Sequence, residues 1–332
     1  SGVLARRGRL EEAVQELEAL APGRTPDPRA ALPLARLYNR LQRFERTVAS
    51  LARLTKTFPR LPEAHYLLGE AYLGLGKAEP ARGALQEAQR LAPENQAARF
   101  RLGQALLRLG RAAEGLEHLQ AVAAKSRGLP GLRVELASAY LALGRLPEAL
   151  REARAARAEQ PGDPRSHDLV ATVHAAQRDY DEALEALGRG LALDPDSLPT
   201  QLLAAEVHAR AYRAAVAAHP RLLAPRLALM QFLLRRQDWA GVFAEGEAAL
   251  GVEPGSPAVH NLLGGAHLAR GDADRARAAF ARALEADHEF VPALVNLGRA
   301  AIGEGALEEA ERHLSRASEL APANPAVTFH LV

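Results

Sequence analysis

The sequence predicts an all-α fold, a right-handed α-solenoid built from antiparallel helix pairs. Three observations lead to this fold class. One pattern of small and apolar residues returns along most of the 332 residues, usually at a step of 34. Each copy of the pattern contains two stripes with the spacing of a helix, joined by a turn. A single helix pair cannot bury its own apolar faces, so successive pairs must stack on one another.

The copy at Pro62–Asn95 shows the pattern most clearly, and it reads PEAHYLLGEAYLGLGKAEPARGALQEAQRLAPEN. Its first stripe occupies positions 4, 7, 8 and 11 of the copy, and its second stripe occupies positions 20, 24 and 27. At about 100° per residue, each set lies along one face of a helix. Gly76 marks the turn between the helices, and Pro93 cannot continue the second helix. The stripe residues are His65, Leu68, Gly69, Tyr72, Ala81, Leu85 and Ala88.

This pattern resembles the tetratricopeptide repeat (TPR), a helix–turn–helix unit of 34 residues. We interpret residues 1–27 as the second helix of a truncated repeat plus a linker, residues 28–324 as a tandem TPR array, and residues 325–332 as the start of a further repeat. Because both ends cut through repeats, we expect the chain to be a fragment of a longer protein. Copies in the array begin at residues 28, 62, 96, 130, 164, 198, 223, 257 and 291.

The copy at residues 198–222 is short, because it lacks positions 14–22 of the repeat, between Arg210 and Ala211. Two interpretations are open. In the first, which we favour because the register resumes on both sides, residues are missing from the sequence at this point. In the second, the two helices fuse into one and the solenoid breaks there.

The chain is not expected to be an enzyme. It contains no Gly-rich phosphate loop, no G-x-S-x-G and no H-E-x-x-H motif. Its paired glutamates, such as Glu11 and Glu12, open second helices, where the helix dipole favours acidic residues. We therefore expect no catalytic residues and no cofactor.

Histidine pairs raise the possibility of a metal site, but their spacing argues against one. His167 and His174 occupy positions 4 and 11 of one repeat, and His260 and His267 do so in another. Residues seven apart lie ~10 Å apart along a helix, too far to share one zinc ion with bonds of ~2 Å. Cysteine is absent, which excludes thiolate ligands. We expect these histidines to pack in the core and expect no metal.

Charge and hydropathy narrow the range of partners. The formal net charge is +2, and no basic block or basic patch with interleaved aromatic residues occurs, so we expect no nucleic-acid partner. No run of 18 apolar residues exists, so no transmembrane segment is expected. Nearly all basic residues are arginines, and alanine and glycine are abundant. We interpret this composition as the product of a GC-rich, bacterial genome.

The TPR resemblance implies a non-catalytic protein–protein interaction scaffold that binds a partner peptide or helix in a concave groove lined by first helices. Residues 257–294 also resemble the long TPR proteins of bacterial cell envelopes that are linked to polysaccharide export or protein sorting. This favours an envelope or secretion assembly and a periplasmic or envelope location. The alternative is a regulatory or substrate-recruiting arm of an enzyme, such as a glycosyltransferase, whose catalytic domain lies outside this fragment.

One TPR subclass grips the C-terminal carboxylates of chaperones with Lys at position 5 and Asn at position 9 of its first repeat. No repeat of this chain carries that pair, so we reject this clamp. Apolar residues Val327 and Leu331 begin a stripe without a partner at the end of the chain. Since solenoids need polar caps, this stripe predicts end-to-end self-association.

By the TPR resemblance, positions 5 and 12 look into the groove, and between residues 62 and 141 they are all apolar. If they are exposed together, we expect an amphipathic helix or an extended apolar segment to dock on them, with Tyr66 and Phe100 as anchors. If they instead pack against the adjacent first helix, they belong to the core. The predicted groove residues are Tyr66, Glu70, Leu73, Phe100, Arg101, Gln104, Leu107, Arg108, Val134 and Leu141.

Overall fold

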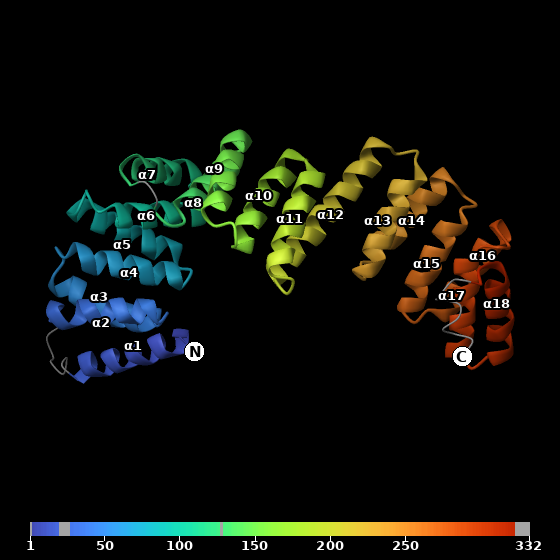
Figure 1. The fold of residues 1–332 in the computed structure, drawn as a ribbon, viewed down its shortest axis with the longest axis horizontal. Helices are drawn as coiled ribbons and strands as arrows, with labels where there is room; N and C mark the ends of the chain where they lie inside the picture. The colour runs from blue at the N-terminus through green and yellow to red at the C-terminus, as the bar shows by residue number, and fades with distance from the viewer. Residues whose placement is uncertain (1, 20–26, 127–128, 323–332) are drawn as a thin grey trace. The chain divides into compact units, whose positions relative to one another are not determined.

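The computed structural model describes residues 2–19, 27–126 and 129–322. Within these ranges the secondary structure consists of eighteen α-helices without a strand (Figure 1). This confirms the predicted all-α fold class. The chain divides into two compact units, Ser1–Gln201 and Leu202–Val332, and the boundary falls inside helix α12. The linker predicted at the end of residues 1–27, and the apolar stripe at Val327 and Leu331, lie largely or wholly outside the described residues.

The helices of the first unit are α1 (Gly2–Ala19), α2 (Pro28–Arg40), α3 (Phe44–Thr57), α4 (Pro62–Gly74), α5 (Ala78–Leu91), α6 (Gln96–Arg108), α7 (Ala112–Lys125), α8 (Leu132–Ala142), α9 (Leu146–Glu159), α10 (Pro164–Gln177) and α11 (Tyr180–Leu193). Helix α12 (Leu198–Ala218) spans the boundary. The second unit continues with α13 (Leu223–Arg235), α14 (Trp239–Val252), α15 (Pro257–Ala269), α16 (Ala273–Ala286), α17 (Val291–Gly303) and α18 (Leu307–Leu320).

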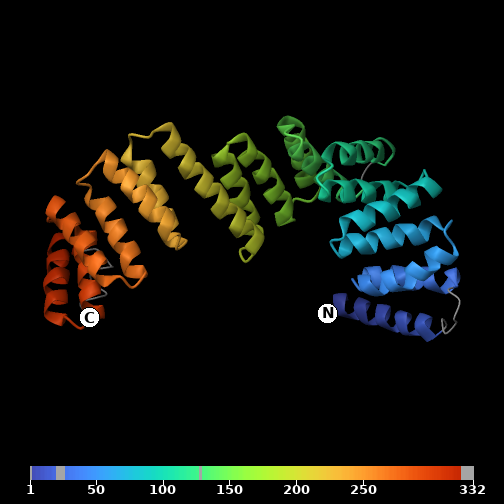
Figure 2. The same ribbon diagram turned by 180° about the vertical axis from the view of Figure 1, so that it is seen from behind.

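Helices that follow one another in the chain pack as pairs, for example α4 with α5 in the first unit and α15 with α16 in the second (Figure 2). The first helix of each pair also contacts the first helix of the next pair. In the first unit this joins α2, α4, α6 and α8 into one row, and in the second unit it joins α13, α15 and α17. The row α2–α4–α6 carries the candidate site described below.

The turn inside each pair depends on a left-handed residue at position 15 of the repeat. Gly76 takes this place after α4 with φ of 71°, a conformation that glycine adopts without steric penalty. Position 15 is not always glycine, because Gln42 and Arg178 hold the same place with φ of 58° and 67°. The left-handed conformation therefore recurs even in repeats where no glycine at position 15 indicates it.

Helix α12 shows what happens when that position is lost. It runs without interruption for 21 residues through Arg210 and Ala211. The absent positions 14–22 include the left-handed residue that would reverse the chain. The chain therefore takes the fused-helix form, the less favoured of the two interpretations.

Glycine at position 8 allows the two helices of a pair to approach closely. A Cβ atom added to Gly69 would lie 2.4 Å from Cγ of Leu85, and one added to Gly298 would lie 2.6 Å from Cγ of Leu314. Carbon atoms that are not bonded to each other do not approach this closely. The small residue is therefore a packing requirement, and the large residue at position 24 of the second helix fills the space that it leaves.

Histidines at position 4 form hydrogen bonds with backbone carbonyl groups in the segment that precedes their own helix. The imidazole Nε2 of His65 lies 2.9 Å from the carbonyl oxygen of Pro59. The Nε2 atoms of His167 and His260 lie 3.2 Å from the carbonyl oxygens of Pro161 and Pro254. A carbonyl oxygen only accepts, so each imidazole donates. Of the four histidines predicted to pack in the core, His167, His174 and His260 are buried, whereas His267 is only partly buried.

Candidate functional site

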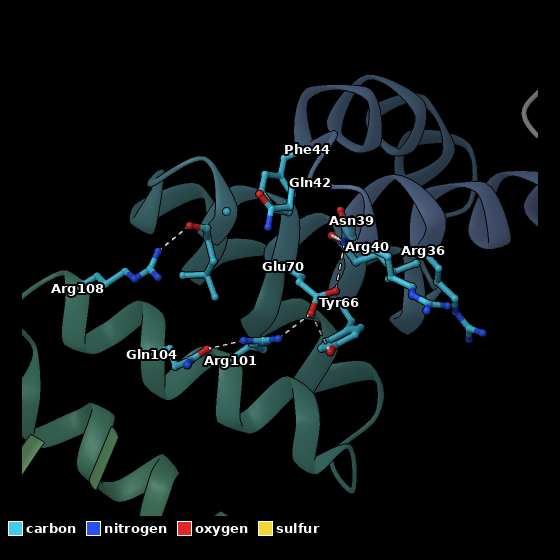
Figure 3. A pocket seen from close by; sticks show the side chains of 13 residues that line it. Arg36, Asn39, Arg40, Gln42, Phe44, Tyr66, Glu70, Arg101, Gln104 and Arg108 are labelled. Carbon is cyan, nitrogen blue, oxygen red and sulfur yellow. Dashed lines mark hydrogen bonds and ion pairs between the residues drawn. The ribbon is translucent and has the colours of Figure 1, made fainter. Parts of the chain in front are cut away.

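A pocket of about 670 Å³ opens over the row of first helices in the first unit (Figure 3). Helices α2, α4 and α6 supply most of its lining, and the turn into α3 supplies the rest. The lining residues are Arg36, Asn39, Arg40, Gln42, Phe44, Tyr66, Leu67, Glu70, Leu73, Gly74, Arg101, Gln104 and Arg108.

Glu70 is the centre of a hydrogen-bond network that joins the three helices (Figure 3). Its carboxylate accepts from Arg101 Nη2 at 2.9 Å on α6 and from Asn39 Nδ2 at 3.2 Å on α2. Asn39 also donates to the carbonyl oxygen of Leu67 at 3.0 Å. Because partners on both neighbouring helices hold Glu70, its charge is already compensated within the protein.

Tyr66 lies beside this network, with its hydroxyl 3.5 Å from Glu70 Oε1. Burial raises the pKa of Tyr66, and the nearby charge of Glu70 raises it further, while Arg101 opposes both effects. The phenol therefore stays protonated at neutral pH and remains a hydrogen-bond donor in the pocket.

The charge of the lining is strongly positive, because it contains four arginines and one glutamate. Arg101 is paired with Glu70 at 2.9 Å, and Arg36 is paired with Glu63 at 2.6 Å. Arg108 donates from Nη1 to the carbonyl oxygen of Leu73 at 2.6 Å. Within the described ranges, neither Arg108 nor Arg40 forms an ion pair with a carboxylate.

The structure brings six of the ten predicted groove residues together in this pocket. They are Tyr66, Glu70, Leu73, Arg101, Gln104 and Arg108. The remaining four, Phe100, Leu107, Val134 and Leu141, do not line it.

The predicted continuous apolar patch needs correction. Leu73 and Phe100 retain only 6% and 7% of their side-chain exposure. For these two residues the packing alternative is correct, because both are buried, and Leu73 packs with Leu102 and Leu106 of the adjacent first helix α6. Val134 is exposed at 37% but lies away from the pocket. The open surface is therefore mainly polar, and Phe100 is not available as a surface anchor.

Sequence reasoning missed the contribution of the repeat at residues 28–61 to this pocket. Arg36, Asn39 and Arg40 occupy positions 9, 12 and 13 of that repeat. Glu70 and Gln104 share position 9, and Arg108 shares position 13. The predicted groove begins at residue 62, and extending positions 9, 12 and 13 back to residues 28–61 would have indicated these three residues.

A second polar cluster in the first unit involves Asp168 of α10. Its Oδ2 atom accepts from the buried Thr200 hydroxyl at 2.9 Å, while its Oδ1 atom is buried without a hydrogen-bond partner. Burial is the main reason why the pKa of Asp168 is raised. The folded state therefore holds this proton more tightly than the unfolded state does. Its contribution to stability is greatest at acidic pH and declines as pH rises through the unfolded pKa towards the folded pKa.

Asp168→Asn is expected to remove this decline, so the variant should gain stability relative to the parent protein between about pH 4 and pH 7. Urea unfolding at both pH values measures the difference. Asp163→Asn at the N-cap of the same helix is the control, because Arg165 lowers the pKa of Asp163 and its effect should have the opposite sign. Equal pH dependence in the parent and in Asp168→Asn would contradict the assignment.

Within the described ranges, no three His, Asp or Glu side chains converge on a point where they could hold a metal ion. None of the helices in those ranges has the length and apolar character needed to cross a bilayer.

Comparison with known proteins identifies the repeat. Two family models, each described as tetratricopeptide repeat, match the chain. One covers residues 106–173, 233–292 and 267–329, and the other covers residues 32–94 and 72–130. Together they account for well over half of the chain. A search of curated proteins by sequence finds no match.

Solved structures with a similar fold include YrrB, described as a TPR protein with an unusual peptide-binding site. It has 21% identity and a TM-score of 0.45, and the match covers 58% of this chain and 95% of that chain. The C-terminal part of a TPR repeat-containing protein from Cytophaga hutchinsonii has 13% identity and a TM-score of 0.45, covering 91% and 99%. The human IFIT1 dimer with m7Gppp-AAAA has 18% identity and a TM-score of 0.48, covering 95% and 77%. Because these similarities are low, the assignment rests on the family models: the chain belongs to the tetratricopeptide repeat family.

Proposed function

We propose that this chain is a non-catalytic protein–protein interaction scaffold and that a segment of a partner protein binds in the pocket over α2, α4 and α6. Tetratricopeptide repeats generally form binding scaffolds for proteins or peptides. The observation that carries the proposal is the concave pocket of about 670 Å³ on three successive first helices. Its polar groups come from different repeats and face one space, as a recognition site requires.

For the assembly in which this protein works, the only support comes from the sequence. The resemblance of residues 257–294 to envelope TPR proteins favours a bacterial envelope or secretion assembly. A regulatory or substrate-recruiting arm of an enzyme is the other setting, and the sequence of the full-length protein distinguishes the two.

The test of the pocket uses two exposed glycines of the same repeat. A Cβ atom at Gly74, which lines the pocket, would lie 2.4 Å from Phe44 Cζ, whereas one at Gly83 on α5 meets nothing within 4 Å. Peptides selected from a random library on the immobilised protein should bind Gly74→Leu about tenfold more weakly. They should bind Gly83→Leu as they bind the parent.

Isothermal titration calorimetry measures these affinities, and circular dichroism checks that both variants keep the parent helix content. Equal affinity of the parent and Gly74→Leu, or an equal loss in both variants, would contradict binding in this pocket.

A further inference from the structure

We propose that the partner segment is acidic and that its carboxylate side chains bind Arg40 and Arg108 at opposite sides of the pocket. This inference rests on the proposed function, since it names the chemistry of the segment that the pocket receives. It differs from the chaperone clamp, whose Lys and Asn pair no repeat of this chain carries.

Internal ion pairs compensate only part of the positive charge of the pocket lining. Glu70 compensates Arg101, and Glu63 compensates Arg36. Arg40 and Arg108 both line the pocket, both are exposed, and neither has a carboxylate partner in the part of the chain that the structure describes. Two positive charges are therefore available to a ligand. Guanidinium groups bind carboxylates through two parallel hydrogen bonds.

The two arginines hold the same repeat position on either side of a glycine. Arg40, Gly74 and Arg108 occupy position 13 of three successive repeats, on α2, α4 and α6. The middle position thus presents no side chain, and the Phe44 ring lies directly beside it. A segment that crosses from one arginine to the other meets glycine backbone and an aromatic ring between them.

The separation of the helices sets the length of the segment that can reach both arginines. Packed helices lie roughly 8–10 Å apart, so the axes of α2 and α6 are separated by roughly 16–20 Å across α4. An extended chain rises about 3.3 Å per residue, and roughly five or six residues span that separation. Acidic residues about four to six positions apart therefore suit the two sites.

The network around Glu70 favours an acidic peptide over a nucleic acid. A phosphate backbone would carry closely spaced negative charges across Glu70, between the two arginines. A peptide can place uncharged residues there and its carboxylates only at the two ends. Tyr66 and Asn39 remain beside the centre as hydrogen-bonding groups for a peptide backbone.

The experiment selects binders from a displayed library of random dodecapeptides without bias in composition. The selected sequences should be enriched in Asp and Glu, with two acidic residues roughly four to six positions apart. The best peptide is then synthesised with an acetylated N-terminus and an amidated C-terminus, so that only side-chain carboxylates remain. Fluorescence anisotropy measures its affinity.

The double variant Arg40→Glu with Arg108→Glu should bind this peptide at least about tenfold more weakly than the parent. Arg40→Gln with Arg108→Gln should weaken binding less, because it removes charge without reversing it. The control is Arg60→Glu with Arg154→Glu, which makes the same change in net charge at two exposed arginines outside the pocket. The control should stay within about twofold of the parent.

Four outcomes overturn the inference. Selected peptides without acidic enrichment that still lose affinity for Gly74→Leu would leave the proposed function standing and remove the acidic specificity. The selection of no peptide would remove both. Binding that requires a free C-terminus would place a terminal carboxylate in the pocket instead of side chains. Displacement of the peptide by an equal concentration of a twenty-nucleotide oligouridine would favour a nucleic acid.

Discussion

Phe280→Ala is expected to lower the free energy of unfolding of the unit Leu202–Val332 by about 3–5 kcal/mol. The Phe280 side chain on α16 has 0% exposure and packs with Leu297. Its ring also occupies the space in front of Gly264, where an added Cβ atom would lie 2.5 Å from Cε1. Alanine therefore leaves a cavity that three helices border. Urea unfolding followed by circular dichroism measures the loss.

Leu307→Ala is the control in the same unit, because the Leu307 side chain is 67% exposed. Its effect should stay within about 0.5 kcal/mol. Phe280→Leu should fall between the two, since it keeps most of the buried apolar volume. A similar loss of unfolding free energy for Phe280→Ala and Leu307→Ala would show that Phe280 does not stabilise the packing of the helix pairs.

Phe100→Ala is expected to destabilise the unit Ser1–Gln201 by about 3 kcal/mol or more, because the ring is buried. Tyr66→Ala should destabilise it less, since Tyr66 is only partly buried and lines the pocket. Thermal unfolding and peptide affinity are measured together for both variants.

Tyr66→Ala should weaken peptide binding while changing the melting temperature little. Phe100→Ala should lower the melting temperature strongly while changing peptide affinity little. If Phe100→Ala lost peptide affinity at an unchanged melting temperature, Phe100 would be a surface anchor after all, and its burial would have no energetic meaning.

The fold class could be predicted because the same packing requirement recurs in successive repeats. Position 8 must be small wherever position 24 is large, as for Gly69 and Leu85, and the sequence displays both. The continuous form of α12 was harder to predict. After a deletion, the two apolar stripes that remain fit either a turn whose residues are missing or one continuous helix. The decisive fact is the absence of position 15, which carries information only once its left-handed conformation is known.

The candidate site could be predicted only in part. The sequence placed Glu70, Arg101, Gln104 and Arg108 near one another, because they lie at related positions of adjacent first helices. It could not show that Phe100 is buried, since a groove position and a core position both hold apolar residues. Burial depends on how closely successive first helices approach, which is a property of the packed row and not of one helix.

The position-4 histidines make each of three junctions between repeats observable by itself. The ring N–H of His65, His167 and His260 is held by the carbonyl oxygens of Pro59, Pro161 and Pro254. The hydrogen bond slows exchange of the ring proton with solvent, and the proton is released when the junction opens. In an NMR spectrum of histidine-labelled protein, the exchange rate of each imidazole proton would therefore report the opening of its own junction. The three rates together show whether the array opens first at one end or in the middle.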